Sequence, residues 1–238
     1  MIYSLEDRLS DSPYVDRIWR AQSERPGTFR SIAMSGWEMV VTRHRGTVSL
    51  TVRGPETKAT GLRISEAGTD YFGIRFKVGT LMPHLPASCL VDQDVSLPGA
   101  SGTSFWMNGS AWPYPDFDNA DTFLDRLARE GLLARNPVVE TALQGRPIDT
   151  SPRNARRHFL RTTGLTHSTI RQIERARYAT VLLLEGRSIL DVVHEAGYYD
   201  QPHLTRSLKR LIGQTPADVM RKDGPEQLSY LYKTEPLS

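Results

Sequence analysis

The spacing of apolar residues divides the chain into a strand-rich first part and a helical second part. Between Thr28 and Pro98, short runs with an apolar residue at every second position are separated by Gly and Pro. Val48, Leu50 and Val52 form one such run, and this alternation is typical of strands with one buried face. From Asp118 onward, apolar residues recur every three or four positions, which predicts helices. We therefore expect an α+β fold, with a β-rich sandwich or barrel followed by an all-α region.

Six runs are expected to form the strands of the β-rich part. They cover residues 28–34, 36–45, 46–54, 59–65, 70–79 and 88–98, with a hairpin turn at Gly46. Before them, the apolar residues Tyr14, Val15, Ile18 and Trp19 form either a helical patch or an arm packed on the sheet. After them comes an aromatic group that either packs the domain junction or lines an effector pocket. It consists of Phe105, Trp106, Trp112, Tyr114 and Phe117.

Residues 188–209, SILDVVHEAGYYDQPHLTRSLK, predict two helices separated by a sharp turn. Ser188 and Asp200 are suited to cap the two helices, and Gly197 is suited to the left-handed position that ends the first. Two leucines four positions apart turn the apolar side of the second helix inward and leave polar and basic residues outside. This pattern predicts a helix-turn-helix motif, whose second helix enters the major groove of DNA.

A second unit of the same kind precedes this one. Ser151 and Pro152 are suited to open a recognition helix that ends at Gly164, with the segment 137–143 as its partner helix. A long helix, capped by Thr166, is expected to join the two units. Two recognition helices held apart by one rigid helix are expected to enter successive major-groove faces, about one turn or ~34 Å apart.

These motifs resemble the DNA-binding domain of AraC/XylS-type transcription regulators over residues 136–222. The matching residues are Ser151, Phe159, Gly164, Arg175, Arg177, Leu182-Leu183-Leu184, Ile189, Gly197-Tyr198, His203-Leu204-Thr205-Arg206 and Gly213-Gln214-Thr215-Pro216. The chain departs from the family pattern at Val193, where Ala is usual, and at Leu208, where Phe is usual. Both are apolar exchanges at positions expected in the core.

The resemblance implies a regulator that binds double-stranded promoter DNA. In such regulators the N-terminal domain is often cupin-like and binds a small-molecule effector or forms a homodimer, and contact with RNA polymerase is a further implied interaction. The residues implied to contact DNA are Arg153, Arg156, Arg157 and Arg161 in the first recognition helix, and Gln201, Pro202, His203, Thr205, Arg206 and Lys209 in the second. Arginine fits guanine, Gln201 fits adenine, and Thr205 fits a thymine methyl group or a phosphate. Arg206 and His203 are suited to hold phosphate.

Four segments follow from these patterns. Residues 1–117 form a β-rich sensor or dimerisation domain, 118–136 a linker helix, 137–222 the double helix-turn-helix domain, and 223–238 a C-terminal tail. The linker helix either pairs with a second copy or packs on its own domain. Residues 137–222 contain fourteen Lys/Arg and eight Asp/Glu, a net charge of +6, whereas the whole chain carries +3. The basic charge therefore lies in the segment expected to meet phosphate.

Composition favours a soluble cytoplasmic protein. The single cysteine, Cys89, excludes a disulfide within the chain and is expected to be a small buried residue. The chain has no run near ~18 apolar residues, so we expect no transmembrane helix. The first residues lack the basic-then-apolar order of a signal peptide.

The chemistry expected of an enzyme is missing from the sequence. A metal-binding cupin needs a His-x-His pair and a Glu, but the β-rich part has only His44 and His84. Glu38 and His44 have the same strand parity, yet surface positions on the outer face are favoured for both. No P-loop, dinucleotide fingerprint or nucleophile elbow occurs. We expect no catalytic activity, metal or cofactor. Two alternatives stay open: a non-sensing N-terminal domain that dimerises or contacts a partner, and a cupin-like metalloenzyme.

Overall fold

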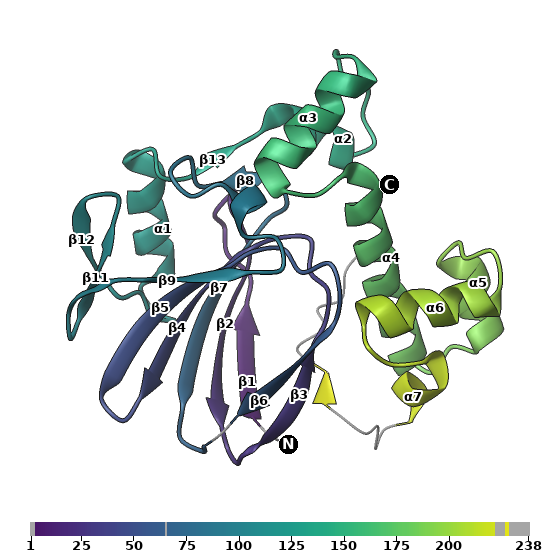
Figure 1. The fold of residues 1–238 in the computed structure, drawn as a ribbon, viewed down its shortest axis with the longest axis horizontal. Helices are drawn as coiled ribbons and strands as arrows, with labels where there is room; N and C mark the ends of the chain where they lie inside the picture. The colour runs from purple at the N-terminus through teal and green to yellow at the C-terminus, as the bar shows by residue number, and fades with distance from the viewer. Residues whose placement is uncertain (1–2, 65, 222–226, 229–238) are drawn as a thin grey trace.

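The structure is a computed structural model that describes residues 3–64, 66–221 and 227–228. It contains a β-rich part followed by a helical part, so the expected α+β fold is confirmed (Figure 1). The tail expected at residues 223–238 lies outside the described residues, apart from residues 227 and 228.

Two sheets make up most of the β-rich part. The larger sheet has six strands in the order β1 (Tyr3–Arg8), β2 (Val15–Ser23), β7 (Asp70–Phe76), β4 (Glu38–His44), β5 (Thr47–Arg53) and β9 (Asp94–Leu97). The smaller sheet places β3 (Gly27–Ser31) between β6 (Thr60–Ile64) and the parallel strand β14 (Gln227–Leu228). The six expected runs thus become β3, β4, β5, β6, β7 and β9.

Short elements complete this part of the chain. They are β10 (Gly99–Ser101), β11 (Ser104–Met107) and β12 (Ser110–Pro113) in one small sheet, β8 (Thr80–Leu81) paired with β13 (Ala134–Arg135), and the 3-10 helix η1 (Ala87–Cys89). The apolar residues before Thr28 lie in strand β2, so the helical interpretation of them was wrong. An irregularity between Val15 and Arg17 changes the parity of β2. Val15 and Ile18 can therefore both be buried although they lie three positions apart.

The larger sheet buries side chains on both of its faces. Successive residues of a strand point to opposite faces. Met39 and Val41 of β4 belong to the main apolar core, which also contains Phe123 and Leu127 of α1 (Ala120–Arg129). Residues of the other parity in β4, including Glu38, line a cavity between the two sheets. Within the segment 118–136, expected to be a linker helix, only the ten residues of α1 are helical. The apolar side of α1 is buried in the N-terminal core.

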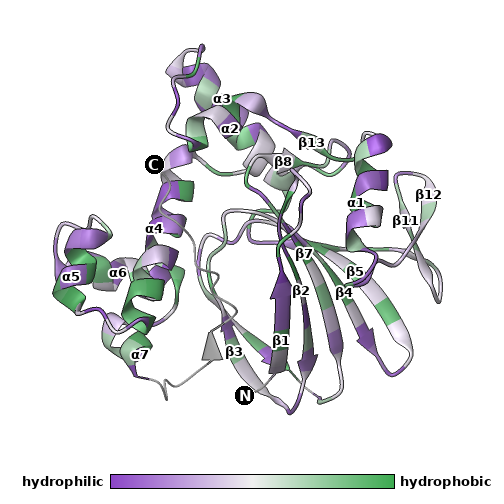
Figure 2. Cartoon of the chain, turned by 180° about the vertical axis from the view of Figure 1, so that it is seen from behind, coloured by the Kyte–Doolittle hydropathy of each residue, from purple (hydrophilic) through white to green (hydrophobic). Residues whose placement is uncertain are grey.

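Six helices follow among the described residues, and five of them are arranged around the sixth, the central helix α4 (His167–Leu184) (Figure 1). The others are α2 (Pro137–Leu143), α3 (Pro152–Thr163), α5 (Ile189–Glu195), α6 (Gln201–Leu211) and α7 (Pro216–Met220). The pair α2–α3 lies at one end of α4, and α5 to α7 lie at the other (Figure 1). Hydrophilic and hydrophobic bands alternate along α1, α3 and α4, as expected for helices buried on one side (Figure 2).

The helix caps form as the sequence predicts. The side chains of Ser151, Thr166, Ser188 and Asp200 each accept a hydrogen bond from a backbone N–H in the first turn of the helix that follows. Gly164 and Gly197 adopt φ angles of 73° and 68° where their helices end. These are local interactions, so residue type and spacing were enough to predict them.

Candidate DNA interface and ligand cavity

Helix α3 presents an unpaired basic surface. Ala155, Phe159 and Thr162 face the interior and are at most 8% exposed. The predicted DNA-contacting residues on the other side are all exposed: Arg153, Arg156, Arg157 and Arg161. Within the described part of the chain, none of these four guanidinium groups forms an ion pair. Their charges are therefore available to an external anion.

Helix α6 has a different outer surface, polar as well as basic. Leu204, Leu208 and Leu211 are buried, and Asp200 Oδ1 accepts a hydrogen bond from His203 N at 2.7 Å. The predicted residues Gln201, Pro202, Arg206 and Lys209 are exposed, whereas His203 and Thr205 are half-buried. The ring of His203 packs edge-on against Tyr198, with 5.2 Å between centroids. The structure thus brings four predicted residues fully to the surface and places two at its edge.

Arg175 and Tyr178 of α4 make three contacts that the sequence did not predict, and these hold the second helix-turn-helix unit against α4. Arg175 of α4 donates from Nη1 to Gly197 O at 3.2 Å, and its guanidinium lies 4.5 Å from the Tyr198 ring centroid. Tyr178 Oη donates to Glu195 Oε1 at 2.9 Å. These contacts fix the orientation of α5 and of the turn before α6. Tyr199, 91% exposed in that turn, is a further candidate contact residue that the sequence pattern did not single out.

The β-rich part touches both helix-turn-helix units. At the second unit, Ala33 N donates to Leu211 O at 2.7 Å, and Ala59 N donates to Arg210 O at 3.0 Å. Both acceptors are carbonyl groups at the end of α6, which have no partner inside the helix. At the first unit, Gly164, which ends α3, packs closely against the segment that carries η1. The same domain therefore holds the ends of both recognition helices.

A cavity of about 310 Å³ lies in the β-rich part, between the larger sheet and the pair β3–β6. It falls in the size range of small-molecule sites, about 300–1,000 Å³. Much of its lining is apolar and includes Leu5, Phe29, Met34, Val40, Leu62 and Ile64. Arg177 of α4 also lines it. The cavity is thus bounded by the β-rich domain and by the helix that joins the two helix-turn-helix units.

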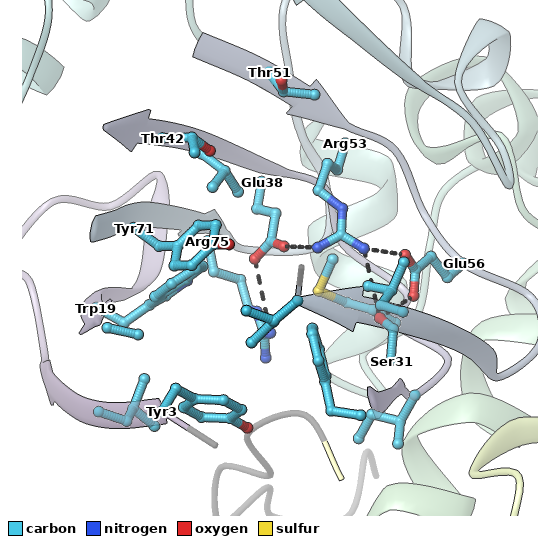
Figure 3. Close-up of a pocket in the computed structure, with 18 of the residues that line it drawn as sticks. Tyr3, Trp19, Ser31, Glu38, Thr42, Thr51, Arg53, Glu56, Tyr71 and Arg75 are labelled. Carbon is cyan, nitrogen blue, oxygen red and sulfur yellow. Dashed lines mark hydrogen bonds and ion pairs between the residues drawn. The ribbon is translucent and has the colours of Figure 1, made fainter. Parts of the chain in front are cut away.

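A row of charged side chains crosses one wall of the cavity (Figure 3). Arg53 lies between two carboxylates: its Nη1 is 3.1 Å from Glu38 Oε1, and its Nη2 is 2.6 Å from Glu56 Oε1. Ser31 Oγ donates to Glu56 Oε2 at 2.8 Å, and Arg75 Nη2 lies 3.8 Å from Glu38 Oε2. Glu38 faces Arg53 and Arg75 because it is their register partner on the two neighbouring strands. The row contains two arginines and two glutamates, so its formal charge is zero.

Some polar atoms of this wall have no hydrogen-bond partner. Glu38 is 4% exposed, and its Oε2 accepts no hydrogen bond among the described residues. Trp19 Nε1 is also buried without an acceptor in this part of the chain. The Trp19 ring lies directly over Gly73, where a β-carbon would collide with it. Burial raises the pKa of Tyr3, which also lines the cavity, to about 12. Its hydroxyl group therefore remains protonated at neutral pH.

Three expectations about individual residues need correction or refinement. Glu38 is not on an outer face, because the larger sheet is covered on both sides. His44 instead contacts Glu66 and Thr69, at 3.1 and 2.9 Å. Cys89 is exposed at the end of η1, not buried. Of the aromatic group, Phe105, Trp112 and Tyr114 pack in the main core, while Trp106 is 48% exposed.

Chemistry for metal binding is likewise missing from the described residues, in which no three His, Cys, Asp or Glu side chains gather at one point. None of the helices in this part of the chain has the length and apolar character needed to cross a membrane. The fold and its two exposed recognition helices define a double helix-turn-helix module joined to a β-rich domain.

Comparison with known proteins agrees with this for the helical part. Residues 146–222, about a third of the chain, match the family model described as "Helix-turn-helix domain". This segment is an AraC-type helix-turn-helix domain, the DNA-binding module of transcription regulators, and the expected resemblance is confirmed here.

Over the whole chain, similarity to known proteins is low. The solved structure of ToxT from Vibrio cholerae aligns over 92% of this chain and 98% of that chain, with 7% identity and a TM-score of 0.39. A similarity this low carries no conclusion about the present chain. No curated protein sequence matches the chain significantly.

Proposed function

We propose that this protein is a sequence-specific transcription regulator that inserts α3 and α6 into successive major grooves of one DNA duplex. The observation that carries the proposal is the unpaired basic surface of α3 at one end of α4, with the polar surface of α6 at the other. A helix of 18 residues such as α4 is about 27 Å long. Neighbouring major-groove faces are ~34 Å apart. Helices that lie at the two ends of α4, as α3 and α6 do, can span this separation.

The residue types on the two helices suit different roles. On α3, Arg153, Arg156 and Arg157 lie within the first two turns, where a guanidinium can donate to guanine O6 and N7. On α6, Gln201 is exposed in the first turn and has the amide geometry that pairs with adenine. Arg161 and Lys209 lie nearer the ends of their helices and suit phosphate contacts, which set the register.

The β-rich domain is proposed to bind a small-molecule effector and to alter the orientation of the two recognition helices. Ser31, Ile32 and Met34 line the cavity. Ala33, between them, bonds to the end of α6 and accepts a hydrogen bond from Arg177 of α4. A ligand that shifts this segment would therefore change how α6 is held. The cavity and α6 would be coupled directly, because the segment 31–34 both lines the cavity and bonds to the end of α6, so no long-range pathway is required.

Footprinting on the protein's own upstream region tests the DNA-binding part. The proposal predicts two protected patches on one side of the duplex, about one helical turn apart. Arg156→Ala should weaken only the patch under α3, and Arg206→Ala only the patch under α6. A single patch lost with either variant would contradict insertion of two separate helices.

A further inference from the structure

The charged row along the cavity wall restricts the chemistry of a ligand. Two arginines and two glutamates alternate along it, and they neutralise one another within the protein. A ligand carboxylate placed here would lie beside the carboxylate of Glu38. A ligand ammonium would lie beside the guanidinium of Arg75. Either would add a buried charge without a counter-ion, which is costly in an apolar environment.

Arg177 does not change this balance at the wall. Its Nη1 donates to Ala33 O at 3.2 Å, so it is engaged at the contact between the domains. It also lines a neighbouring cavity together with Glu174 of the same helix, which supplies an opposite charge there. With the charges of the wall balanced, the polar groups that a ligand can bind there are the atoms that lack hydrogen bonds.

A ligand can complete the hydrogen bonding of those atoms if it supplies one donor and one acceptor. Glu38 Oε2 lacks a donor and Trp19 Nε1 lacks an acceptor among the described residues. Glu38 on β4 and Trp19 on β2 both line the cavity, and β7 lies between these two strands. A hydroxyl group or a primary amide can both donate and accept. Much of the rest of the lining is apolar and includes Phe29, Leu62 and Ile64. Hydroxyl groups of Tyr3, Thr42, Thr51 and Tyr71 also line the cavity, as does Arg63, which is exposed to solvent.

We propose that the cavity binds an uncharged small molecule with an apolar body and a hydroxyl or primary amide head held by Glu38 and Trp19. This rests on the proposed sensing function of the β-rich domain and specifies its ligand class. The charge-neutral wall selects against acids and amines of the same shape. Discrimination arises because a charged head would be buried without compensation, whereas a neutral head completes hydrogen bonds that the wall lacks.

A head-group series tests this directly: cinnamyl alcohol, cinnamamide, cinnamate and cinnamylammonium share one body. Binding to the full-length protein is measured by calorimetry, with thermal shift as a second readout. The alcohol and the amide are expected to bind at least about tenfold more tightly than either ion, a factor typical of one unpaired buried group. Equal or tighter binding of either ion, or no binding of the two neutral compounds, would overturn the proposal.

Variants assign the preference to the cavity wall. Glu38→Gln removes the carboxylate shared by Arg53 and Arg75, so cinnamate should gain affinity relative to the alcohol. Glu66→Gln is the matched control, because Glu66 is half-exposed and pairs with His44 and Arg45 outside the cavity. Trp19→Phe keeps an aromatic ring without the N–H, so the affinity for the neutral compounds should fall several-fold. This variant tests the same assignment if Glu38→Gln does not fold. An unchanged order of affinities in a folded Glu38→Gln or Trp19→Phe variant would contradict the assignment.

The same preparation is titrated with promoter DNA in parallel. Specific DNA binding together with the wrong order of head groups would refute the ligand class and leave the proposed regulator intact. The correct order without specific DNA binding would refute the regulator and leave the cavity chemistry intact.

Discussion

The guanidinium group of Arg177 donates a hydrogen bond from Nη1 to the carbonyl oxygen of Ala33 at 3.2 Å, across the contact between the helical and β-rich parts. Arg177 is 2% exposed and Ala33 is fully buried. The N–H of Ala33 donates in the opposite direction, to the end of α6. One residue of the β-rich domain thus bonds to both the central helix and the second recognition helix.

Arg177→Met should weaken this contact. It leaves the buried carbonyl group of Ala33 without the Arg177 donor, which costs about 2–3 kcal/mol of unfolding free energy. Urea denaturation followed by circular dichroism measures the change. Arg171→Met on the same helix is the control, because Arg171 is exposed, and it should change stability by no more than about 0.5 kcal/mol. Equal losses in the two variants would show that the Ala33 contact contributes nothing.

Substitution of the outer arginines should affect DNA binding and not folding. Arg156→Ala and Arg206→Ala are each expected to weaken specific binding by ~1–3 kcal/mol if the residue reads a base. A residue that only holds phosphate should instead reduce the salt dependence and leave sequence preference unchanged. Arg129→Ala on α1 is the control, since Arg129 is exposed in the β-rich part, away from both recognition helices. A similar loss in that variant would point to a general effect of charge.

Two glycines with the same backbone conformation should differ in their response to alanine. Gly164 and Gly197 both have positive φ angles, which cost about 1–2 kcal/mol for a residue with a β-carbon. Gly197 has open space around that position, but at Gly164 a β-carbon would collide with Val91 and lie 2.9 Å from Ser88 Cα. Gly164→Ala should therefore destabilise the fold by a further ~1–3 kcal/mol. Thermal unfolding of both variants measures the difference, and equal losses would contradict the contact between η1 and α3.

His167 should make the contact between α3 and α4 sensitive to acid. Its ring stacks on Phe159 with centroids 4.9 Å apart. Burial, and then the charge of Arg171, lower the pKa of His167 below its usual 6.5. Below pH 6.5 the unfolded chain binds a proton at His167 that the folded chain does not bind. The free energy of unfolding therefore decreases as the pH is lowered, until the pH lies below the folded-state pKa of His167.

Replacing this imidazole with a ring that cannot titrate isolates its contribution. His167→Phe keeps the stacking, so its melting temperature should fall less than that of the wild type between about pH 7 and pH 5. Identical pH profiles of the two proteins would mean that His167 titrates at the same pH in both states.

The helical half could be predicted closely because its signals are local. Ser151, Ser188 and Asp200 cap helices within three residues of their own position, and the spacing of Leu204 and Leu208 fixes the buried side of α6. Each of these interactions needs only neighbouring residues. Residue type and spacing were therefore sufficient.

The cavity could not be predicted in this way. Glu38 meets Arg53 across a hairpin, but it meets Arg75 only because β7 inserts between β2 and β4. That neighbour depends on the order of strands, which alternation along one strand does not specify. A signal was nevertheless present: Glu38, Val40 and Thr42 have the parity opposite to the apolar core residues. Parity does not say whether the second face of a sheet is covered, and an outer-face position was therefore favoured for Glu38.

The central claim is tested most directly by titrating the purified protein against its own upstream promoter DNA and a scrambled duplex, by fluorescence anisotropy at two salt concentrations. We predict that it binds the promoter at least ~10³-fold more tightly, with an affinity that falls steeply as salt rises. Equal and weak binding to both duplexes, unchanged when a genome-wide pool of fragments is offered, would contradict the assignment of this protein as a sequence-specific regulator.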